Sequence, residues 1–368
     1  MSIIIFIAVL VLIILVHELG HFLAAKFFDI KTEEFGIGFP PRLKTLFWWG
    51  ETRFTLNAIP FGGFVKIFGE DPTEESIEGP EKERSFVNKN RAIQAVVLFS
   101  GVFFNALLAV LFIFLAFLIG IPVSEGTYDS EYVDDARVTV MNVLEDSPAD
   151  LAGLEVRDVL LKVQDVQGEE MLIEGNDDLS TFLSTRNNEE VTVYYERDSV
   201  QEEISVVPQE GLIEEDVGPA IGVGVVSVGT ASFPPHIALV EGVKHSVDLI
   251  VLITVGLTDF IANIFTGGAD FSEIAGPVGI VGLVGDAWSI GFAYLLYFTA
   301  IISLHLTVIN LLPFPALDGG RLLFVGIESV TRKTIKPEIA NALNSIGFIL
   351  LVLLMIAVTV NDFSRLFG

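Results

Sequence analysis

Residues 2–28, SIIIFIAVLVLIILVHELGHFLAAKFF, are the most informative part of the chain. Its residues 3–16 carry no polar side chain, which is the composition of a membrane-spanning helix. His17 and His21 are four residues apart, so a helix places both imidazoles on one face, one turn apart. Such a pair can bind one Zn²⁺, and Glu18 beside it is placed to accept a proton from a water. The pattern favours a metal site inside a membrane span.

The depth of this site follows from helix geometry. Fourteen apolar residues at 1.5 Å each reach roughly 21 Å into a hydrocarbon layer about 30 Å thick. The metal is therefore expected about two-thirds of the way across, with residues 22–28 completing the span. The alternative is a chance match in a soluble helix or a vestigial site, because this histidine pattern alone is weak. A third metal ligand elsewhere in the sequence would favour a functional metal site over a chance match.

Composition agrees with a membrane protein. The chain has 368 residues, of which 51% are hydrophobic, and a mean hydropathy of +0.61, which indicates several membrane spans. It contains no cysteine, so disulfides, thiolate metal ligands and a cysteine nucleophile are excluded.

Charge is concentrated in one segment. Residues 122–235 hold 26 Asp and Glu against 5 Lys and Arg, so this segment carries most of the net charge of −27. Such a surface repels phosphate, which excludes nucleic acid as a partner. The segment is expected to be a solvated domain.

The predicted fold is a polytopic α-helical membrane protein with about four transmembrane helices. The expected spans are residues 2–28, 92–121, 292–312 and 339–360. The expected domains are an N-terminal membrane half (1–121), a soluble α+β domain (122–232), a linking region (233–288) and a C-terminal membrane half (289–368).

The linking region is expected to hold a helix over 236–266 and a Gly-rich loop over 267–285. The helix is predicted to be amphipathic and to lie on the outer face of the bilayer. A crossing there would reverse the next span and place Asp318 on the opposite side from His21.

Lysine and arginine placement orients the spans. Residues 26–91 hold ten of the 21 Lys and Arg, and residues 321–336 hold four more. The positive-inside rule makes these segments cytoplasmic, so the acidic domain is expected outside the cell membrane and the metal site toward the cytoplasmic side.

Asp318, in NLLPFPALDGG of residues 310–320, is the candidate third ligand. The span over 292–312 runs inward and ends in the same leaflet as His21, so a carboxylate there completes a His₂Asp set and leaves one tetrahedral position for water. The alternative is that Asp318 caps a helix. Asn310 is expected to hydrogen-bond a substrate backbone or an oxyanion, or else a neighbouring helix.

Several motifs together resemble one family. HELGH in a first span and NLLPFPALDGG in a later one resemble the site-2 protease family of intramembrane zinc metalloproteases, peptidase family M50, especially the regulator-of-sigma-E protease type. The resemblance covers nearly the whole chain and implies that His17, His21 and Asp318 bind one Zn²⁺ per chain, while Glu18 activates the water. Further matching motifs are FGIGF (35–39), PFGGFVK (60–66), GVFFN (101–105) and GPVGI (276–280).

Residues 52–68 alternate apolar and polar side chains around Pro60, which predicts a β-hairpin. The resemblance makes it a membrane-reentrant hairpin, and a free strand edge would hold a substrate extended by β-augmentation. The alternative is a cytosolic hairpin. The residues predicted to contact substrate are Phe61, Gly62, Gly63, Asn310 and Pro313.

The acidic domain contains SPADLAGLEVRDVL at residues 147–160, which resembles a PDZ domain. Ile221, Gly222 and Val223 fit its peptide-binding loop, where backbone N–H groups would hold a carboxylate terminus. The alternative is a PDZ domain that binds no peptide and filters access to the active site.

The predicted protein is an intramembrane zinc endopeptidase that cuts single-span membrane proteins, such as anti-sigma factors, in regulated intramembrane proteolysis. Its partners are then these substrates and the lipid bilayer. One alternative is a catalytically silent PDZ-containing membrane scaffold, which the intact Glu18 and ligands disfavour. Another is a zinc transporter, which the scarcity of other acidic and histidine residues in the spans disfavours.

Overall fold

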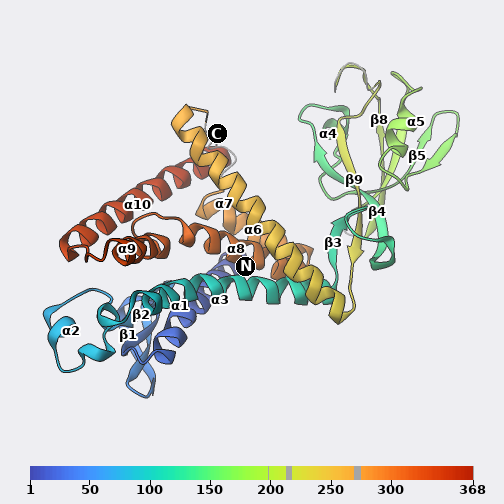
Figure 1. Cartoon of the computed structure of the whole chain (residues 1–368). Coiled ribbons are helices and arrows are strands. Elements are labelled where there is room, and N and C mark those ends of the chain that lie inside the picture. Colours follow the sequence, from blue (N-terminus) through green and yellow to red (C-terminus); the bar gives the residue numbers. More distant parts are fainter. Residues whose placement is uncertain (198, 213–217, 269–274, 368) are drawn as a thin grey trace. The chain divides into compact units, whose positions relative to one another are not determined.

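Long apolar helices dominate the chain (Figure 1). The computed structural model describes residues 1–197, 199–212, 218–268 and 275–367, and within these residues five helices are long and apolar enough to cross a membrane. They are α1 (Ser2–Phe27), α3 (Arg91–Ile119), α6 (Pro235–Thr266), α8 (Phe292–Leu311) and α10 (Pro337–Phe367). The chain divides into two units, Met1–Ala116 with Pro235–Gly368, and Phe117–Pro234.

Helix α6 qualifies as a span by length and composition. The prediction that residues 236–266 lie on the outer face, and with it the count of four spans, therefore stays a prediction. Within its unit α6 packs near α3, since Gly242 lies against the backbone of Phe114. His245 of α6 also bonds the hydroxyl of Tyr297 on α8, with 2.8 Å between Nε2 and the phenolic oxygen.

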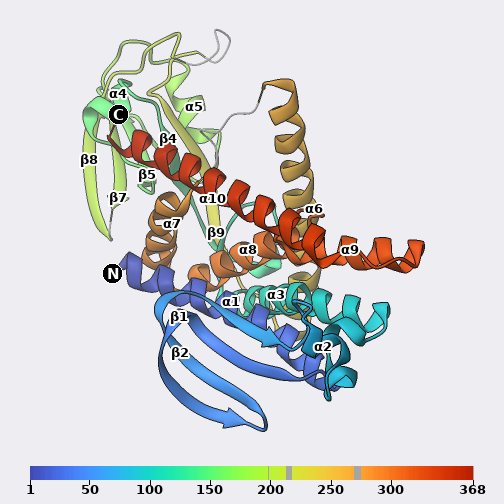
Figure 2. The same ribbon diagram turned by 90° about the vertical axis from the view of Figure 1, so that its left-hand side faces the viewer.

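A long β-hairpin follows α1, but its limits differ from the prediction. Strand β1 (Thr32–Trp49) pairs antiparallel with β2 (Thr52–Ile67), and the turn is at Gly50 and Glu51, where Gly50 has a φ of +60° (Figure 2). The predicted hairpin within residues 52–68 is wrong, because that segment is one strand. The alternation was real, but Pro60 and the two glycines after it mark irregular pairing within β2 rather than a turn.

Ion pairs hold the hairpin turn to the segment before α3. Arg84 lies in a 3₁₀ turn (Lys82–Arg84) after the short helix α2 (Glu74–Glu78), and it bonds the Glu51 carboxylate. These hydrogen bonds lower the pKa of Glu51 to about 2, so the pair stays ionised at neutral pH. A second 3₁₀ turn (Phe86–Asn88) leads into α3.

Helix α7 (Pro277–Ile290) corrects the predicted Gly-rich loop, which was expected to extend to residue 285. Pro277 occupies the first turn, where its missing N–H costs nothing, and Val284 and Ala287 are buried in one cluster with Val9 and Ile13 of α1. This packing outweighs the low helix propensity of the glycines. The buried Asp362 carboxylate of α10 accepts hydrogen bonds from the backbone N–H groups of residues 276, 278 and 279.

The second unit is a sheet with two short helices. In its described part, the strand order is β3-β9-β4-β5-β7-β8, and β6 pairs with β5. The strands are β3 (Ile121–Ser124), β4 (Val133–Val143), β5 (Val159–Asp165), β6 (Glu170–Leu172), β7 (Val191–Arg197), β8 (Val200–Val206) and β9 (Val223–Ala231). The helices are α4 (Pro148–Ala152) and α5 (Asp178–Leu183), with a 3₁₀ turn at Ser130–Tyr132.

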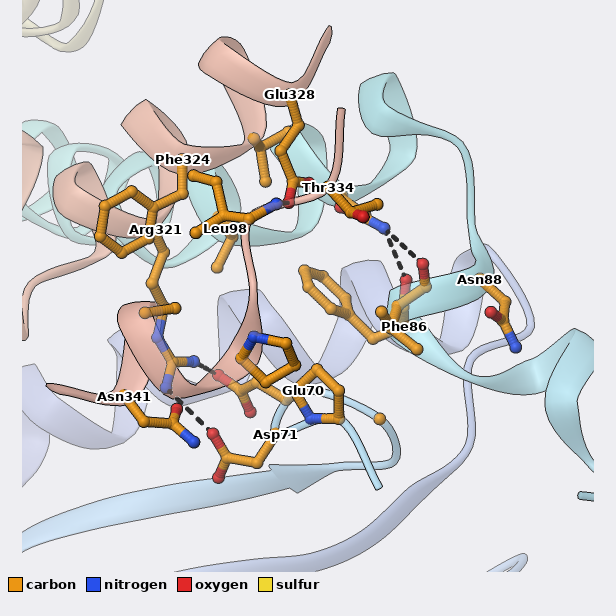
Figure 3. A pocket seen from close by; sticks show the side chains of 18 of the residues that line it. Glu70, Asp71, Phe86, Asn88, Leu98, Arg321, Phe324, Glu328, Thr334 and Asn341 are labelled. Carbon is orange, nitrogen blue, oxygen red and sulfur yellow. Dashed lines mark hydrogen bonds and ion pairs between the residues drawn. The ribbon is translucent and has the colours of Figure 1, made fainter. Parts of the chain in front are cut away.

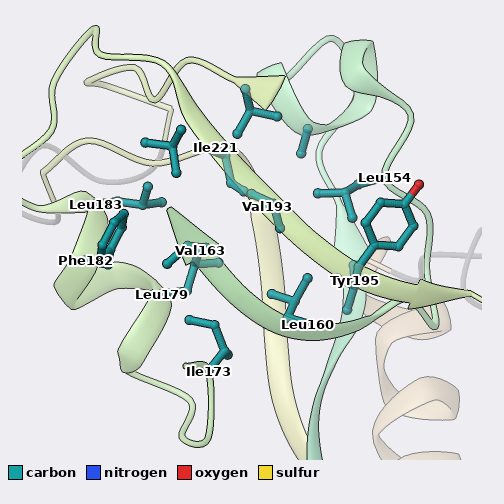
Figure 4. Close-up of a cluster of buried hydrophobic side chains, with 14 of the residues drawn as sticks. Leu154, Leu160, Val163, Ile173, Leu179, Phe182, Leu183, Val193, Tyr195 and Ile221 are labelled. Atoms are coloured by element: carbon teal, nitrogen blue, oxygen red, sulfur yellow. The ribbon is translucent and has the colours of Figure 1, made fainter. Parts of the chain in front are cut away.

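This unit has its own core, although its surface is strongly acidic. Strand residues that alternate inward meet the side chains of α5, as Figure 4 shows for Leu160, Val163, Val193 and Phe182. Burial alternates with period two along β7, whereas a register shift between Leu160 and Lys162 interrupts the alternation along β5. The unit therefore has a hydrophobic core made of its own residues.

We predict that Leu160→Ala lowers the free energy of unfolding of this unit by about 2–5 kcal/mol, because Leu160 is 2% exposed and its truncation leaves a cavity. The matched control is Leu151→Ala, which changes a leucine that is 78% exposed, with an expected effect within about 0.5 kcal/mol. Pulse proteolysis of the full-length protein across a urea series measures both. Equal effects of the two substitutions would contradict the core described here.

Candidate active site

Two histidines and one aspartate converge in the first unit. The Nε2 atoms of His17 and His21 lie 3.1 Å apart, and they lie 3.0 and 3.3 Å from Oδ2 of Asp318. The candidate ligand atoms of the three residues all fall within 4.8 Å of one another. Residues about 300 positions apart in the sequence thus form one cluster, in which both histidines are buried.

Asp318 reaches the histidines through the turn after α8. It is the first residue of α9 (Asp318–Thr331), and the N-cap of this helix is Leu317, so Asp318 does not occupy the N-cap position. Gly319 and Gly320 let the start of α9 approach the carbonyls of residues 311, 312 and 314, where any Cβ would clash. Asn344 of α10 accepts a hydrogen bond from the Ala316 N–H, which holds the turn from its other side.

Helix α3 crosses α1 at the level of the histidines. A Cβ at Gly20 would meet the Ser100 carbonyl, and a Cβ at Gly101 would meet the rings of both His17 and His21. Only glycine at both positions permits this crossing. It brings hydrogen-bonding groups of α3 against the imidazoles, where the apolar surroundings offer few other partners.

Both imidazoles have partners on α3. His21 Nδ1 lies 2.8 Å from the Val97 carbonyl, and His17 Nδ1 lies 3.3 Å from Nδ2 of Asn105. A carbonyl can only accept, so His21 carries its proton on Nδ1 and leaves Nε2 free to bind a metal. The sequence singled out residues 101–105 as a motif but gave Asn105 and Gly101 no role.

Glu18 lies on the same cavity. Its Oε2 accepts a hydrogen bond of 2.9 Å from the Val65 N–H of β2, so the hairpin fixes the carboxylate beside the cluster. The cavity has a volume of about 200 Å³. Its walls are Glu18 and the three residues of the cluster, together with Phe64, Val65, Ile67, Glu70, Phe86, Val97 and Leu98.

The cluster fits a zinc ion. Two imidazole nitrogens and one carboxylate oxygen form the donor set of many zinc hydrolases. Oδ2 of Asp318 is buried, and within the described residues it has no hydrogen-bond donor to compensate its loss of water. A cation between the three side chains would satisfy this oxygen.

A second cavity of about 450 Å³ adjoins the first (Figure 3). The two share Glu70, Phe86 and Leu98 as walls. At their junction Arg321 of α9 forms an ion pair with Glu70 and lies 3.9 Å from Asp71. Burial lowers the pKa of the Arg321 guanidinium. The catalytic cavity is thus bounded on this side by a charged contact between α9 and the segment after β2.

The predicted substrate-binding residues are not brought into the catalytic cavity. Among the described residues, its walls include neither Asn310 nor Pro313, and β2 contributes residues 64, 65 and 67 rather than Gly62 and Gly63. Gly63 instead packs on Leu15 of α1. The side chain of Phe61 lies outside the described part of the chain.

The His₂Asp cluster and the long apolar helices suit a zinc metalloprotease embedded in a membrane. Comparison with known proteins agrees: the chain belongs to peptidase family M50, whose model matches residues 5–354. Zinc metalloprotease RasP of Oceanobacillus iheyensis is 29% identical over 100% of this chain and 99% of its own. RasP of Shouchella clausii is 28% identical over 99% of each chain. A Clostridium perfringens protein provisionally named a zinc metalloprotease is 34% identical over 95% of each.

The family confirms the predicted enzyme class, a zinc metalloprotease of the site-2 type. It also agrees with a multi-pass membrane protein that acts on membrane proteins in a lipid environment.

We predict that Gly101→Ala reduces zinc binding at least about tenfold, because the new methyl group must displace either the histidine rings or α3. The matched control is Gly256→Ala on α6, where an added Cβ meets nothing within 4 Å among the described residues. Zinc content after dialysis against a weak chelator measures both. Wild-type zinc retention in Gly101→Ala would contradict the close helix crossing.

Proposed function

We propose that His17, His21 and Asp318 bind one Zn²⁺ per chain and that Glu18 is the general base of peptide hydrolysis within the membrane. The observation that carries the proposal is the convergence of the three donor atoms within 4.8 Å, beside a fixed carboxylate. Hydrolysis requires metal ligands and a general base that lie on one cavity, and this arrangement is present. A scaffold protein requires neither, so the geometry favours the hydrolase.

Zinc, when bound, supplies Lewis acidity, which makes an attacking water more acidic and polarises the scissile carbonyl. Glu18 accepts the proton of the attacking water as the C–O bond forms. It then donates this proton to the amine nitrogen as the C–N bond breaks. Because the Val65 N–H holds Oε2, we assign the proton transfer to Oε1.

We predict that Glu18→Gln keeps zinc and the fold but lowers hydrolysis at least about a hundredfold, since an amide cannot accept the proton. Asp318→Ala is expected to lose zinc as well as activity, because two imidazoles alone retain the metal weakly. Metal analysis by mass spectrometry and cleavage of a purified transmembrane substrate separate the two effects. Near-normal cleavage by zinc-loaded Glu18→Gln would refute this mechanism.

The substrates proposed are single-span membrane proteins, including anti-sigma factors. A transmembrane helix hides its peptide bonds in its own hydrogen bonds, so the enzyme must hold the chain extended. We propose that the hairpin of β1 and β2 enters the membrane and offers a strand edge for this purpose. Its exposed apolar side chains support membrane contact: Leu43, Leu46, Phe47, Trp48 and Trp49.

The proposed substrate contacts also include residues of β2 and of the end of α8. Gly62 has a φ of +127°, where a side chain would strain the backbone and strike the Phe39 ring. Phe61, Gly62 and Gly63 would therefore present backbone to the substrate. Asn310, in the last turn of α8, and Pro313 beyond it would contact the substrate farther from the cavity.

We further propose that residues 122–232 are a PDZ domain outside the cell membrane, with the active site toward the cytoplasmic side. The concentration of Lys and Arg in residues 26–91 and 321–336 supports this orientation. The Ile221 side chain is buried in the domain core, so Ile221, Gly222 and Val223 would bind a peptide through their backbone. Gly222 supports this with a φ of +85° directly before β9.

We predict that the PDZ domain filters substrates by size and takes no part in the chemistry. Deleting residues 122–232 should leave cleavage of a short transmembrane substrate intact and permit cleavage of substrates with bulky outer domains. Two fusions that differ only in outer-domain size, each incubated with intact and deleted enzyme, measure this. An inactive but folded deletion variant would mean that the domain contributes directly to the active state.

A further inference from the structure

We propose that Asn105 of α3 is a positioning residue for the metal: its side-chain oxygen accepts the Nδ1–H of His17 and thereby sets the zinc affinity of the site. The inference rests on the proposed function, because it takes His17 as a zinc ligand. It assigns a role to the GVFFN motif, which the mechanism leaves unused.

The position of Asn105 suits this role. Its side chain is fully buried, and its amide nitrogen lies 3.3 Å from Nδ1 of His17. Its amide oxygen is also buried and has no hydrogen-bond partner among the described residues. An unsatisfied amide oxygen in an apolar setting costs about 1–3 kcal/mol, so a donor for this oxygen is needed.

The tautomer of His17 supplies that donor. His17 directs Nε2 at Asp318 and His21, so Nε2 is its metal-facing atom and must keep a lone pair. The ring proton is then on Nδ1, which cannot accept a bond from an amide N–H. Amide oxygen and nitrogen have the same shape, so a half-turn of the Asn105 amide places Oδ1 against this proton. The turn pairs the Nδ1–H donor of His17 with the Oδ1 acceptor of Asn105.

The same logic already holds at His21, whose Nδ1 donates to the Val97 carbonyl. Helix α3 therefore orients both imidazoles, one through its backbone and the other through a side chain. Such outer hydrogen bonds fix the ring and raise its basicity, and their loss typically weakens metal binding about 10–100-fold. Of the two, only the bond from Asn105 can be removed by substitution.

A purely structural role for Asn105 makes a different prediction. The hydroxyl of Ser303 on α8 donates to the backbone carbonyl of Asn105 at 2.8 Å, which ties α8 to α3. Any residue at position 105 supplies that carbonyl. Substitution of the side chain therefore tests the contact with His17 without removing the link between the helices.

The experiment measures zinc affinity of the purified full-length protein in detergent by competition with a chromophoric chelator. Asn105→Leu keeps the size of the side chain but removes the acceptor, and should weaken zinc binding about 10–100-fold. Asn105→Asp keeps an acceptor and should bind zinc at least as tightly as the wild type. Thr299→Val is the matched control, because it removes a buried hydroxyl of α8 that bonds within its own helix.

Asp318→Ala in the same assay distinguishes a failure of the proposed ligand set from a failure of the proposed role of Asn105. If Asp318→Ala loses zinc while Asn105→Leu binds it normally, the role of Asn105 is refuted and the ligand set stands. Equal weakening by Asn105→Asp and Asn105→Leu also refutes it, because packing would then explain both. If Asp318→Ala keeps full affinity, the ligand set fails and this inference fails with it.

A spectroscopic test covers the case in which Asn105→Leu does not fold. In zinc-loaded protein labelled with ¹⁵N-histidine, the Nδ1–H proton of His17 should resonate downfield, as a hydrogen-bonded proton does. Asn105→Asp should shift it further downfield, since a carboxylate is the stronger acceptor. An unchanged resonance would overturn the proposal.

Discussion

The close crossing of α3 over α1 is the contact on which the site depends. Two glycines, Gly20 and Gly101, remove the side chains that would keep the helices apart. Without that approach the Val97 carbonyl would not reach His21, nor Asn105 reach His17. In a membrane, small residues at a helix interface give close van der Waals packing, which replaces the hydrophobic effect as the source of association.

A second constraint is that polar groups in an apolar setting need partners. The site meets it in layers: the outer imidazole nitrogens are paired with α3, the Glu18 carboxylate is paired with the backbone of β2, and the Asp318 carboxylate faces the imidazoles, where a bound cation would satisfy it. Each layer comes from a different segment, so the arrangement forms only when α1, the hairpin, α3 and α9 are all in place. Metal affinity is therefore coupled to the packing of the whole unit.

The hairpin combines two tasks. Its β2 strand fixes Glu18 through Val65, while its far end exposes aromatic side chains such as Trp48 and Trp49. The same hairpin thus both holds the Glu18 carboxylate and exposes apolar side chains at its far end. Glu70, shortly after the same strand, lines the cavity beside Glu18 and forms an ion pair with Arg321.

Residues 2–28 predict a helix with His17 and His21 on one face, because a four-residue spacing on a helix fixes which side chains lie together. The motifs HELGH and NLLPFPALDGG together predicted the enzyme class, and the direction of the span before Asp318 made this residue the third candidate ligand. The sequence also indicated extended structure in residues 52–68, but as a hairpin rather than as the single strand β2. It did not give the partner of β2, the helix over residues 277–290, or the roles of Gly101 and Asn105. Those depend on contacts between segments distant in the chain. The local periodicity of the sequence does not show which two helices cross closely or which buried imidazole nitrogen needs an acceptor. Both become visible only when the packing of the helices is known.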